Sequence, residues 1–342
     1  MRYGRYVATS LLALGGSGFV GRAVVDEGCR RGWEVTTFNR GRGPAVDGVS
    51  QIIGDRRDRA SLERLRDRDW DVVVDTWSGA PCAARDSAAV LAHHAARYIY
   101  ISSGSVYAPP PPIGGDESAA TVEASPDAEN GDYSELKRGA ELAVTQAFGD
   151  RALVARAGTI LGPHEDVGRL PWWLNRMAAG GEILAPGPPG LQLQLIDARD
   201  LASFVLDAAL AGHSGPFNVV SRRGHATMRS LLEACHEVAG APDALLTWMD
   251  PHAVIAAGIE PWTELPIWLP PDSEFAGMHA ANVERANAAG LHCRPVEQTV
   301  QETWTWLSEL DGPPPLRSDV DPPGLDSARE SAALDAWHVR TL

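Results

Sequence analysis

A glycine-rich turn between an apolar segment and an amphipathic segment constrains the fold of this chain most strongly. The turn reads Gly15-Gly16-Ser17-Gly18-Phe19-Val20-Gly21, and it follows the apolar run Thr9–Leu14. A strand that ends in such a turn brings backbone N–H groups to the start of a helix, and the missing Cβ atoms leave room for a phosphate. The sequence therefore predicts a βαβ unit that binds a dinucleotide, in preference to a purely structural turn.

Strand-like and helix-like segments alternate through the first half of the chain. Short apolar strands are predicted at 34–38, 71–75, 98–102 and 152–155, with helices at 59–68, 81–96 and 133–148. This alternation predicts an α/β fold of the Rossmann type, with a doubly wound, mostly parallel sheet and a smaller C-terminal substrate-binding domain.

The pattern loosens after about Gly162, where Pro and Trp become frequent. We expect residues 1–165 to form a NAD(P)-binding Rossmann domain, with 192–221 returning to it. Residues 166–310 would form a substrate or lid domain, and 311–342 a C-terminal tail that includes a short docking helix. Within 192–221 we predict strands at 192–196 and 217–220.

The end of the second predicted strand bears on the choice of cofactor. The segment Phe38-Asn39-Arg40-Gly41-Arg42 has no carboxylate for a ribose 2′-hydroxyl, and its two guanidinium groups can bind a 2′-phosphate. We therefore favour NADP(H) over NAD(H), although both arginines could instead be solvated in a loop. Asp55 and Arg56 follow a third short strand and are further candidate cofactor residues. Asp55 could accept a hydrogen bond from adenine or cap a helix.

Tyr133 and Lys137 have the spacing of an acid/base pair. Residues four positions apart share one face of a helix, and an ammonium beside a phenol favours the phenolate. Such a tyrosine can exchange a proton with a carbonyl or alcohol oxygen during hydride transfer. Lys137 is also the single lysine of the chain, whose other 29 basic residues are arginines. The alternative is an exposed helix with one Tyr–Lys pair.

Three serines follow the predicted strand 98–102, at the strand end where open α/β sheets bind ligands. Ser102, Ser103 and Ser105 each carry a hydroxyl that could orient the reacting oxygen, and each could instead form a turn.

In combination, these residues resemble the extended short-chain dehydrogenase/reductase superfamily, and within it the NAD-dependent epimerase/dehydratase family. The likeness extends to about Leu307 and rests on matched features in order along the chain: Gly15, Gly18 and Gly21, Gly54-Asp55, Ser103 with Val106-Tyr107, Tyr133 with Lys137, Arg156 with Gly162-Pro163, and Ile196 with Arg199-Asp200-Leu201. The resemblance implies that Tyr133 is the acid/base, Lys137 its ribose-binding partner, and Ser103 the carbonyl-orienting hydroxyl.

The resemblance further implies a set of cofactor-lining residues. Asp55 would bind adenine, and the others are Thr76, Trp77, Ser78, Ser102, Ala157 and Thr159. Two positions depart from the nucleotide-sugar members of the family: Thr159 replaces their usual Asn, and Leu193 replaces an Arg that holds the substrate diphosphate. Arg169, Arg176 or Arg294 could replace that cation.

The tryptophans of the second half fit an apolar substrate pocket, although core packing is the simpler explanation for any one of them. We name Trp172 and Trp173, with Ser105 and Tyr107, as candidate substrate residues.

Charge and composition exclude several classes of partner. The 45 acidic and 30 basic residues leave a formal charge of −15, which argues against nucleic-acid binding. No run of about 18 apolar residues exists, so we expect no membrane span. The four scattered cysteines form no CxxC, which predicts a reducing, cytoplasmic environment and no structural zinc site. We expect no catalytic metal either, and a homodimer is an expectation by analogy alone.

Three functions remain open from the sequence. The first is an NADP(H)-dependent reductase or dehydrogenase of a small carbonyl or alcohol. The second is a NAD-dependent sugar-nucleotide epimerase or dehydratase. The third is a nucleotide-sensing or RNA-associated protein without turnover, against which the Tyr–Lys pair and the acidic charge count.

Overall fold

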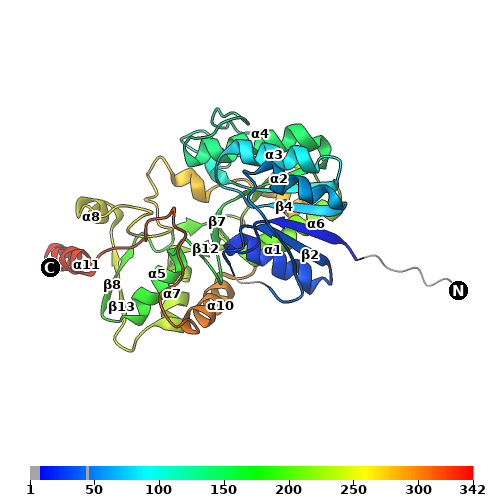
Figure 1. The fold of residues 1–342 in the computed structure, drawn as a ribbon. Coiled ribbons are helices and arrows are strands. Elements are labelled where there is room, and N and C mark those ends of the chain that lie inside the picture. Colours follow the sequence, from blue (N-terminus) through cyan, green and yellow to red (C-terminus); the bar gives the residue numbers. More distant parts are fainter. Residues whose placement is uncertain (1–7, 44–45, 342) are drawn as a thin grey trace.

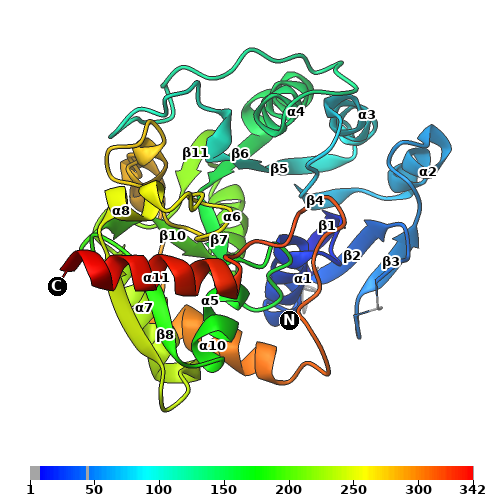
Figure 2. The same ribbon diagram turned by 90° about the vertical axis from the view of Figure 1, so that its left-hand side faces the viewer.

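The computed structural model describes residues 8–43 and 46–341. Its largest feature is a seven-stranded sheet in the order β11-β6-β5-β4-β1-β2-β3, in which every neighbouring pair is parallel (Figure 2). The strands are β1 (Ser10–Leu14), β2 (Glu34–Asn39), β3 (Ser50–Ile53), β4 (Trp70–Asp75), β5 (Ala95–Ser103), β6 (Ala152–Ala157) and β11 (Gly215–Val219). The Rossmann-type α/β fold is confirmed.

Helices cover both faces of this sheet because its central strands are apolar on both sides. Leu11 and Ala13 of β1 pack under α1 (Phe19–Arg30) and α6 (Ala198–Leu210). Leu12 and Leu14 pack on the opposite face, which α2 (Arg59–Glu63), α3 (Pro81–Leu91) and α4 (Tyr133–Phe148) cover. Alternating side chains point to opposite faces of a strand, so a continuous apolar run belongs in a two-sided core.

The strand order reverses beside β1, which lies between β2 and β4. In open parallel sheets a crevice forms at such a reversal, outside the carboxyl ends of the strands. The glycine turn follows β1 and therefore lies at this crevice.

A second lobe has a hydrophobic core of its own. Figures 1 and 2 show it beside the main sheet, with α11 along its outer side. Its elements are α5 (Arg169–Ala178), β8 (Glu182–Pro186), α7 (Met228–Ala239), β13 (Leu245–Met249), α8 (Pro251–Ala256), α10 (Val296–Ser308) and α11 (Ser327–Thr341). A short helix, α9 (Glu284–Ala288), packs instead on the main sheet through Ala286.

The predicted strand at 192–196 is wrong in one respect, because the chain breaks it in two. β9 (Gln192–Leu193) pairs with β12 (Ala226–Thr227), and β10 (Leu195–Asp197) pairs with β7 (Thr159–Leu161). Neither joins the main sheet; of the two strands predicted within 192–221, only the second, observed as β11, does so. The break falls at buried Gln194, whose side-chain amide donates to the carbonyls of Ser221 and Ala281.

We call residues 311–326 the crossing segment. Two backbone hydrogen bonds attach it to other parts of the chain. The backbone N–H of Arg317 donates to the Asp166 carbonyl, and that of Gly324 donates to the Thr263 carbonyl. Beyond the segment, buried Glu330 of α11 accepts from Arg176 and from the backbone N–H of Leu184. Figure 2 shows the segment passing from α10 toward the main sheet before it reaches α11.

Trp173 tests the second core. Its side chain is fully buried and donates to the Pro266 carbonyl. Replacing it by alanine should lower the free energy of unfolding by about 3–5 kcal/mol, through lost burial and a cavity. Leu245→Ala, at an exposed side chain of β13, is the control and should change it by less than about 0.5 kcal/mol. Urea unfolding followed by circular dichroism measures both; equal stabilities would contradict the packing.

Candidate active site

The glycine turn has the geometry that a bound pyrophosphate requires. Gly16 has φ +89, and a Cβ there would lie 2.6 Å from Cγ2 of Thr37. A Cβ on Gly21 would lie 2.6 Å from the backbone nitrogen of Gly16, so α1 packs directly on the turn. At Gly18, which lines the cavity, a Cβ would lie 3.6 Å from Oδ2 of Asp166. The turn therefore fits a dinucleotide.

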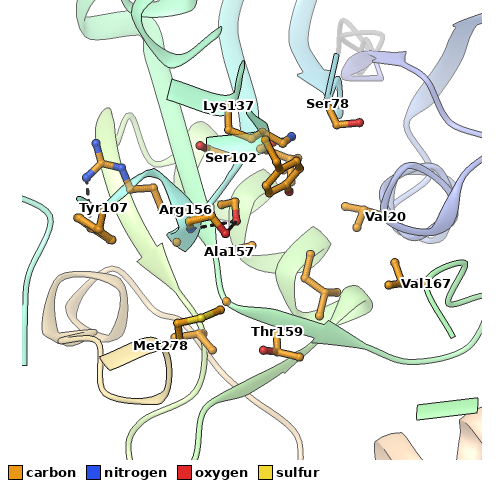
Figure 3. Close-up of a pocket in the computed structure, with 18 of the residues that line it drawn as sticks. Val20, Ser78, Ser102, Tyr107, Lys137, Arg156, Ala157, Thr159, Val167 and Met278 are labelled. Atoms are coloured by element: carbon orange, nitrogen blue, oxygen red, sulfur yellow. Dashed lines mark hydrogen bonds between the residues drawn. The ribbon is translucent and has the colours of Figure 1, made fainter. Parts of the chain in front are cut away.

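A cavity of about 780 Å³ lies at the carboxyl ends of the strands, between the main sheet and the second lobe. Figure 3 shows Val20 and Val167 at one side of it and Tyr107 and Arg156 at the other. The predicted site residues that line it are Gly18, Phe19, Val20, Gly21, Thr76, Ser78, Ser102, Ser103, Ser105, Tyr107, Tyr133, Lys137, Ala157 and Thr159. The fold thus brings together residues from distant parts of the chain.

Tyr133 and Lys137 reach this cavity because α4 begins at its edge. Asp132 and Glu135 form a reciprocal capping box that starts the helix at Tyr133. The tyrosine is 48% exposed, while Lys137 one turn later is buried. The Lys137 Nζ donates to the carbonyl oxygens of Trp77 and Ile101, each at 2.7 Å.

The environment of Lys137 favours its neutral form. Burial lowers the pKa of the ammonium to about 7, against the opposing attraction of Asp75. The positive charge of Arg317 adds to the lowering. The Tyr100 ring lies 5.0 Å from the Nζ.

The three serines have different partners. The Ser102 hydroxyl is buried and donates to Glu141 at 2.6 Å, so it holds α4 against β5. The Ser103 hydroxyl donates to that of Ser105 at 3.1 Å and accepts from the Ser105 backbone N–H. Ser103 and Ser105 also line the cavity, and neither hydroxyl is hydrogen-bonded to a carboxylate.

A buried polar cluster supports the far side of the cavity. Glu141 accepts two hydrogen bonds from Arg156, each at 3.0 Å. Arg156 also donates to the Tyr107 hydroxyl, which in turn donates to Asn218 at 2.6 Å. The hydroxyl of Tyr107 is thus engaged within the protein, and its ring faces the cavity.

Arg56 and Trp77 do not line the cavity, and their predicted role in cofactor binding stays a prediction. Buried Arg56 forms an ion pair with Asp75 at 2.7 Å, and its guanidinium lies 4.6 Å from the Trp77 ring. The Asp75 carboxylate also accepts from Tyr98. Arg56 neutralises a carboxylate that the end of β4 would otherwise bury unpaired.

The remaining predicted cofactor residues do not line the cavity: Gly15, Ser17, Asn39, Arg40, Arg42 and Asp55. Asn39 donates to the Gly15 carbonyl at 3.3 Å and accepts from the Gly41 backbone N–H at 2.8 Å. Arg40, Arg42 and Ser17 are exposed. The Asp55 side chain accepts from the backbone N–H of Arg57, which lowers its pKa. The residue that caps α2 is Asp58, whose carboxylate accepts from the backbone N–H groups of Ala60 and Ser61, so the capping alternative for Asp55 is wrong.

Trp172 and Trp173 do not line the cavity and belong to the second core, so their predicted substrate role gains no support from the cavity. α5 has one apolar stripe, and both indoles pack edge to face with centroids 4.6 Å apart against the second core. The apolar pattern that suggested a pocket is the pattern of core packing.

The charged and aromatic cavity residues from the second lobe and the crossing segment were not among the predicted site residues: Asp166, Arg169, Trp262, Arg317 and Asp319. Of these, the sequence indicated only Arg169, as one of three arginines that could replace the cation absent at Leu193. The Asp166 carboxylate accepts from the Phe19 N–H at 3.4 Å, at the positive end of α1. A protein carboxylate therefore lies where the glycine turn would bind phosphate.

Membrane spans and metal clusters are both missing from the described part of the chain. Within residues 8–43 and 46–341, no helix is long and apolar enough to cross a membrane. The same residues contain no group of three or more His, Cys, Asp or Glu side chains that could hold a metal ion.

Sequence comparison identifies a family over most of the chain. The profile of the NAD dependent epimerase/dehydratase family matches residues 11–220. No curated protein matches the chain.

Solved structures share the fold at low identity. WbmG from Bordetella bronchiseptica, in complex with NAD, has a TM-score of 0.65 and 16% identity, covering 90% of this chain and 96% of its own. UDP-glucose 4-epimerase from Thermus thermophilus, in complex with NAD, has a TM-score of 0.60 and 20% identity, covering 87% of this chain and 99% of its own. UDP-N-acetylglucosamine 4-epimerase from Methanobrevibacter ruminantium, in complex with UDP-N-acetylmuramic acid, has a TM-score of 0.66 and 18% identity. The match covers 89% of this chain and 99% of the epimerase's own.

The titration of Lys137 can be read directly, because the chain has no other lysine. In protein labelled with ¹³C at lysine Cε, NMR should show one side-chain signal with a midpoint near pH 7, as expected from the lowered pKa. Lys137→Met removes the signal and confirms its assignment. A midpoint near the ordinary value of 10.5 would contradict the burial of this ammonium.

Asp166 should weaken dinucleotide binding, because its carboxylate competes for the N-terminus of α1. Asp166→Asn should therefore increase affinity for NADH by about 3- to 30-fold, the range expected for one charge at a helix terminus. Asp26→Asn, at an exposed carboxylate on α1 outside the cavity, is the control and should leave affinity unchanged. Fluorescence titration of NADH measures both. Weaker or unchanged binding by Asp166→Asn would refute the competition.

Proposed function

Since the chain belongs to the NAD dependent epimerase/dehydratase family, we propose that it is a dinucleotide-dependent enzyme that epimerises or dehydrates a nucleotide-linked sugar. One observation carries the proposal. Tyr133 and Lys137 line the same cavity as Gly18 and Gly21 of the glycine turn, at the place where the strand order reverses. A proton-transfer group therefore shares one cavity with a site that fits a nicotinamide dinucleotide.

The residues of the cavity support complementary roles. Bound NAD would supply a hydride acceptor at its nicotinamide ring. The phenolate oxygen of Tyr133 would take the proton from a substrate hydroxyl, and the resulting phenol would return it to the carbonyl that forms. Ser103 and Ser105 orient that oxygen. Lys137 holds the ribose.

The division of labour between the two lobes is part of the proposal. Residues 1–165 form the dinucleotide-binding domain, and residues 166–310 supply the substrate side of the cavity. Residues 311–342 close one side, since Arg317 and Asp319 line it.

We propose NAD as the resident cofactor. The WbmG and UDP-glucose 4-epimerase structures are complexes with NAD, and the matching family is named for it. NADP is the second candidate, because Arg40 and Arg42 are exposed at the end of β2, where the chain has no carboxylate. Comparing the affinities for NADH and NADPH in the wild type and in Arg40→Gln/Arg42→Gln tests the choice. A large NADPH preference that this double variant abolishes would favour NADP.

A reductase of a small carbonyl, which the sequence ranked first, is the competing function. The two functions differ in their redox balance. An epimerase returns the hydride to the same substrate molecule and leaves the cofactor oxidised, whereas a reductase consumes one reduced cofactor per turnover. Protein purified with tightly held NAD, and without net NADH or NADPH consumption, supports the epimerase or dehydratase.

Tyr133→Phe tests the acid/base role. With UDP-glucose or UDP-N-acetylglucosamine as substrate and product sugars resolved by NMR, turnover should fall by about 100- to 10,000-fold, the usual contribution of a positioned acid/base. NAD affinity should stay at the wild-type value, since the substitution removes only a hydroxyl. Ser134→Ala, the next residue of α4 and outside the cavity, should retain full turnover. Full turnover by Tyr133→Phe would rule out the mechanism.

A further inference from the structure

One guanidinium in the cavity lacks an acidic partner. Arg169 begins α5, and its side chain makes no hydrogen bond or ion pair with any residue that the structure describes. The nearby Glu165 carboxylate instead accepts from the backbone N–H groups of Arg169 and Leu170. Burial lowers the pKa of Arg169, and Glu165 opposes that shift only through space. A partly buried cation without a bound acceptor retains its full capacity to bind an oxyanion.

Trp262 holds this guanidinium in place. The Arg169 guanidinium carbon lies 5.0 Å from the centre of the indole ring, and both residues line the cavity. Trp262 has φ +68, a left-handed conformation that is strained for a bulky residue. Its backbone N–H donates to the Trp268 carbonyl at 3.1 Å, which helps to keep the backbone there. Strain of this kind persists where neighbouring structure imposes it, often at a ligand site.

The other cations that the sequence offered are already paired. Arg176 donates to Glu330 and to the carbonyls of Gly180 and Glu182. Arg294 donates to Asp200, at 2.7 Å for the closest pair of atoms. Leu193, at the position where relatives with nucleotide-sugar substrates often carry arginine, is fully buried. Of the replacements considered, Arg169 alone faces the cavity.

The charges around Arg169 leave the cavity receptive to an anion. Tyr133 and Arg317 both act on the pKa of Arg169 through space, so the three lie near one another. Arg317 approaches Asp319, with 3.4 Å between Nε and the carboxylate. Asp166 faces the N-terminus of α1. The carboxylates that line the cavity therefore have other partners, and Arg169 remains for the ligand.

We propose that Arg169, stacked on Trp262, binds the diphosphate of the substrate and so replaces the cation absent at Leu193. The inference rests on the proposed function, because it names the part of a nucleotide-linked sugar that this residue recognises. A planar guanidinium supported by an aromatic face can donate two parallel hydrogen bonds to phosphate oxygens.

Titration of UDP into the full chain, with and without NAD, tests this role. Arg169→Gln should weaken UDP binding by about 10- to 100-fold, the value of charge-assisted hydrogen bonds, and leave NAD affinity unchanged. The UDP affinity of Arg169→Lys, which keeps the charge but not the paired donors, should lie between those of the wild type and Arg169→Gln. Arg229→Gln is the matched control: Arg229 stacks on Trp248 at 5.4 Å but lies outside the cavity, and UDP binding should equal wild type.

The outcomes separate this inference from the function on which it rests. Wild-type protein that binds UDP no better than Arg169→Gln would overturn the inference, even if NAD binds and turnover is seen. An equal loss of NAD and UDP affinity would assign Arg169 to the cofactor and also overturn it. If wild type does not bind NAD, the proposed function fails, while the UDP titration still decides the role of Arg169. If Arg169→Gln does not fold, the same comparison with Arg169→Lys decides it.

Discussion

The hydrogen bonds from Lys137 to the carbonyls of Trp77 and Ile101 join α4 to the carboxyl ends of the main sheet. One turn earlier, Tyr133 reaches the cavity; one turn later, Glu141 accepts from Ser102 of β5 and from Arg156 of β6. Three side chains at i, i+4 and i+8 thus form one stripe that is exposed at its start and buried at its end. Because the buried groups have partners, the phenol has a defined position over the cavity.

The opposite wall depends on contacts between distant parts of the chain. Asp166 meets the first turn of α1, and the crossing segment binds the backbone of Asp166 through Arg317. These contacts bring a carboxylate and a guanidinium to the glycine turn. The same wall carries Arg169 and Trp262, so the glycine turn and the part of the cavity that we propose for substrate adjoin. A ligand bound at the glycine turn and a ligand bound at Arg169 would therefore contact the same wall of the cavity.

Local patterns predicted the parts of the site that depend on spacing. The glycine turn needs a strand before it and a helix after it, and both are periodic in sequence. Tyr133 and Lys137 share a helix face whatever surrounds them. Arg56 shows the limit of this reasoning: a charged residue after a strand looked available for a ligand, but buried Asp75 takes it as a partner. Trp173 shows a related limit, because an apolar residue at helical spacing fits a pocket wall and a core equally well, and the structure buries this one in the second core.

By itself, the sequence determined the parallel sheet, the turn at its centre and the acid/base pair, because strand and helix periodicity and fixed i, i+4 spacing act over a few residues. Only the tertiary structure decided which charges line the cavity. Asp166, Arg169 and Arg317 belong to segments that have no regular spacing from the glycine turn, and packing of the second lobe brings them together. Whether a guanidinium is paired or open depends on its neighbours in space, and these come from distant parts of the chain.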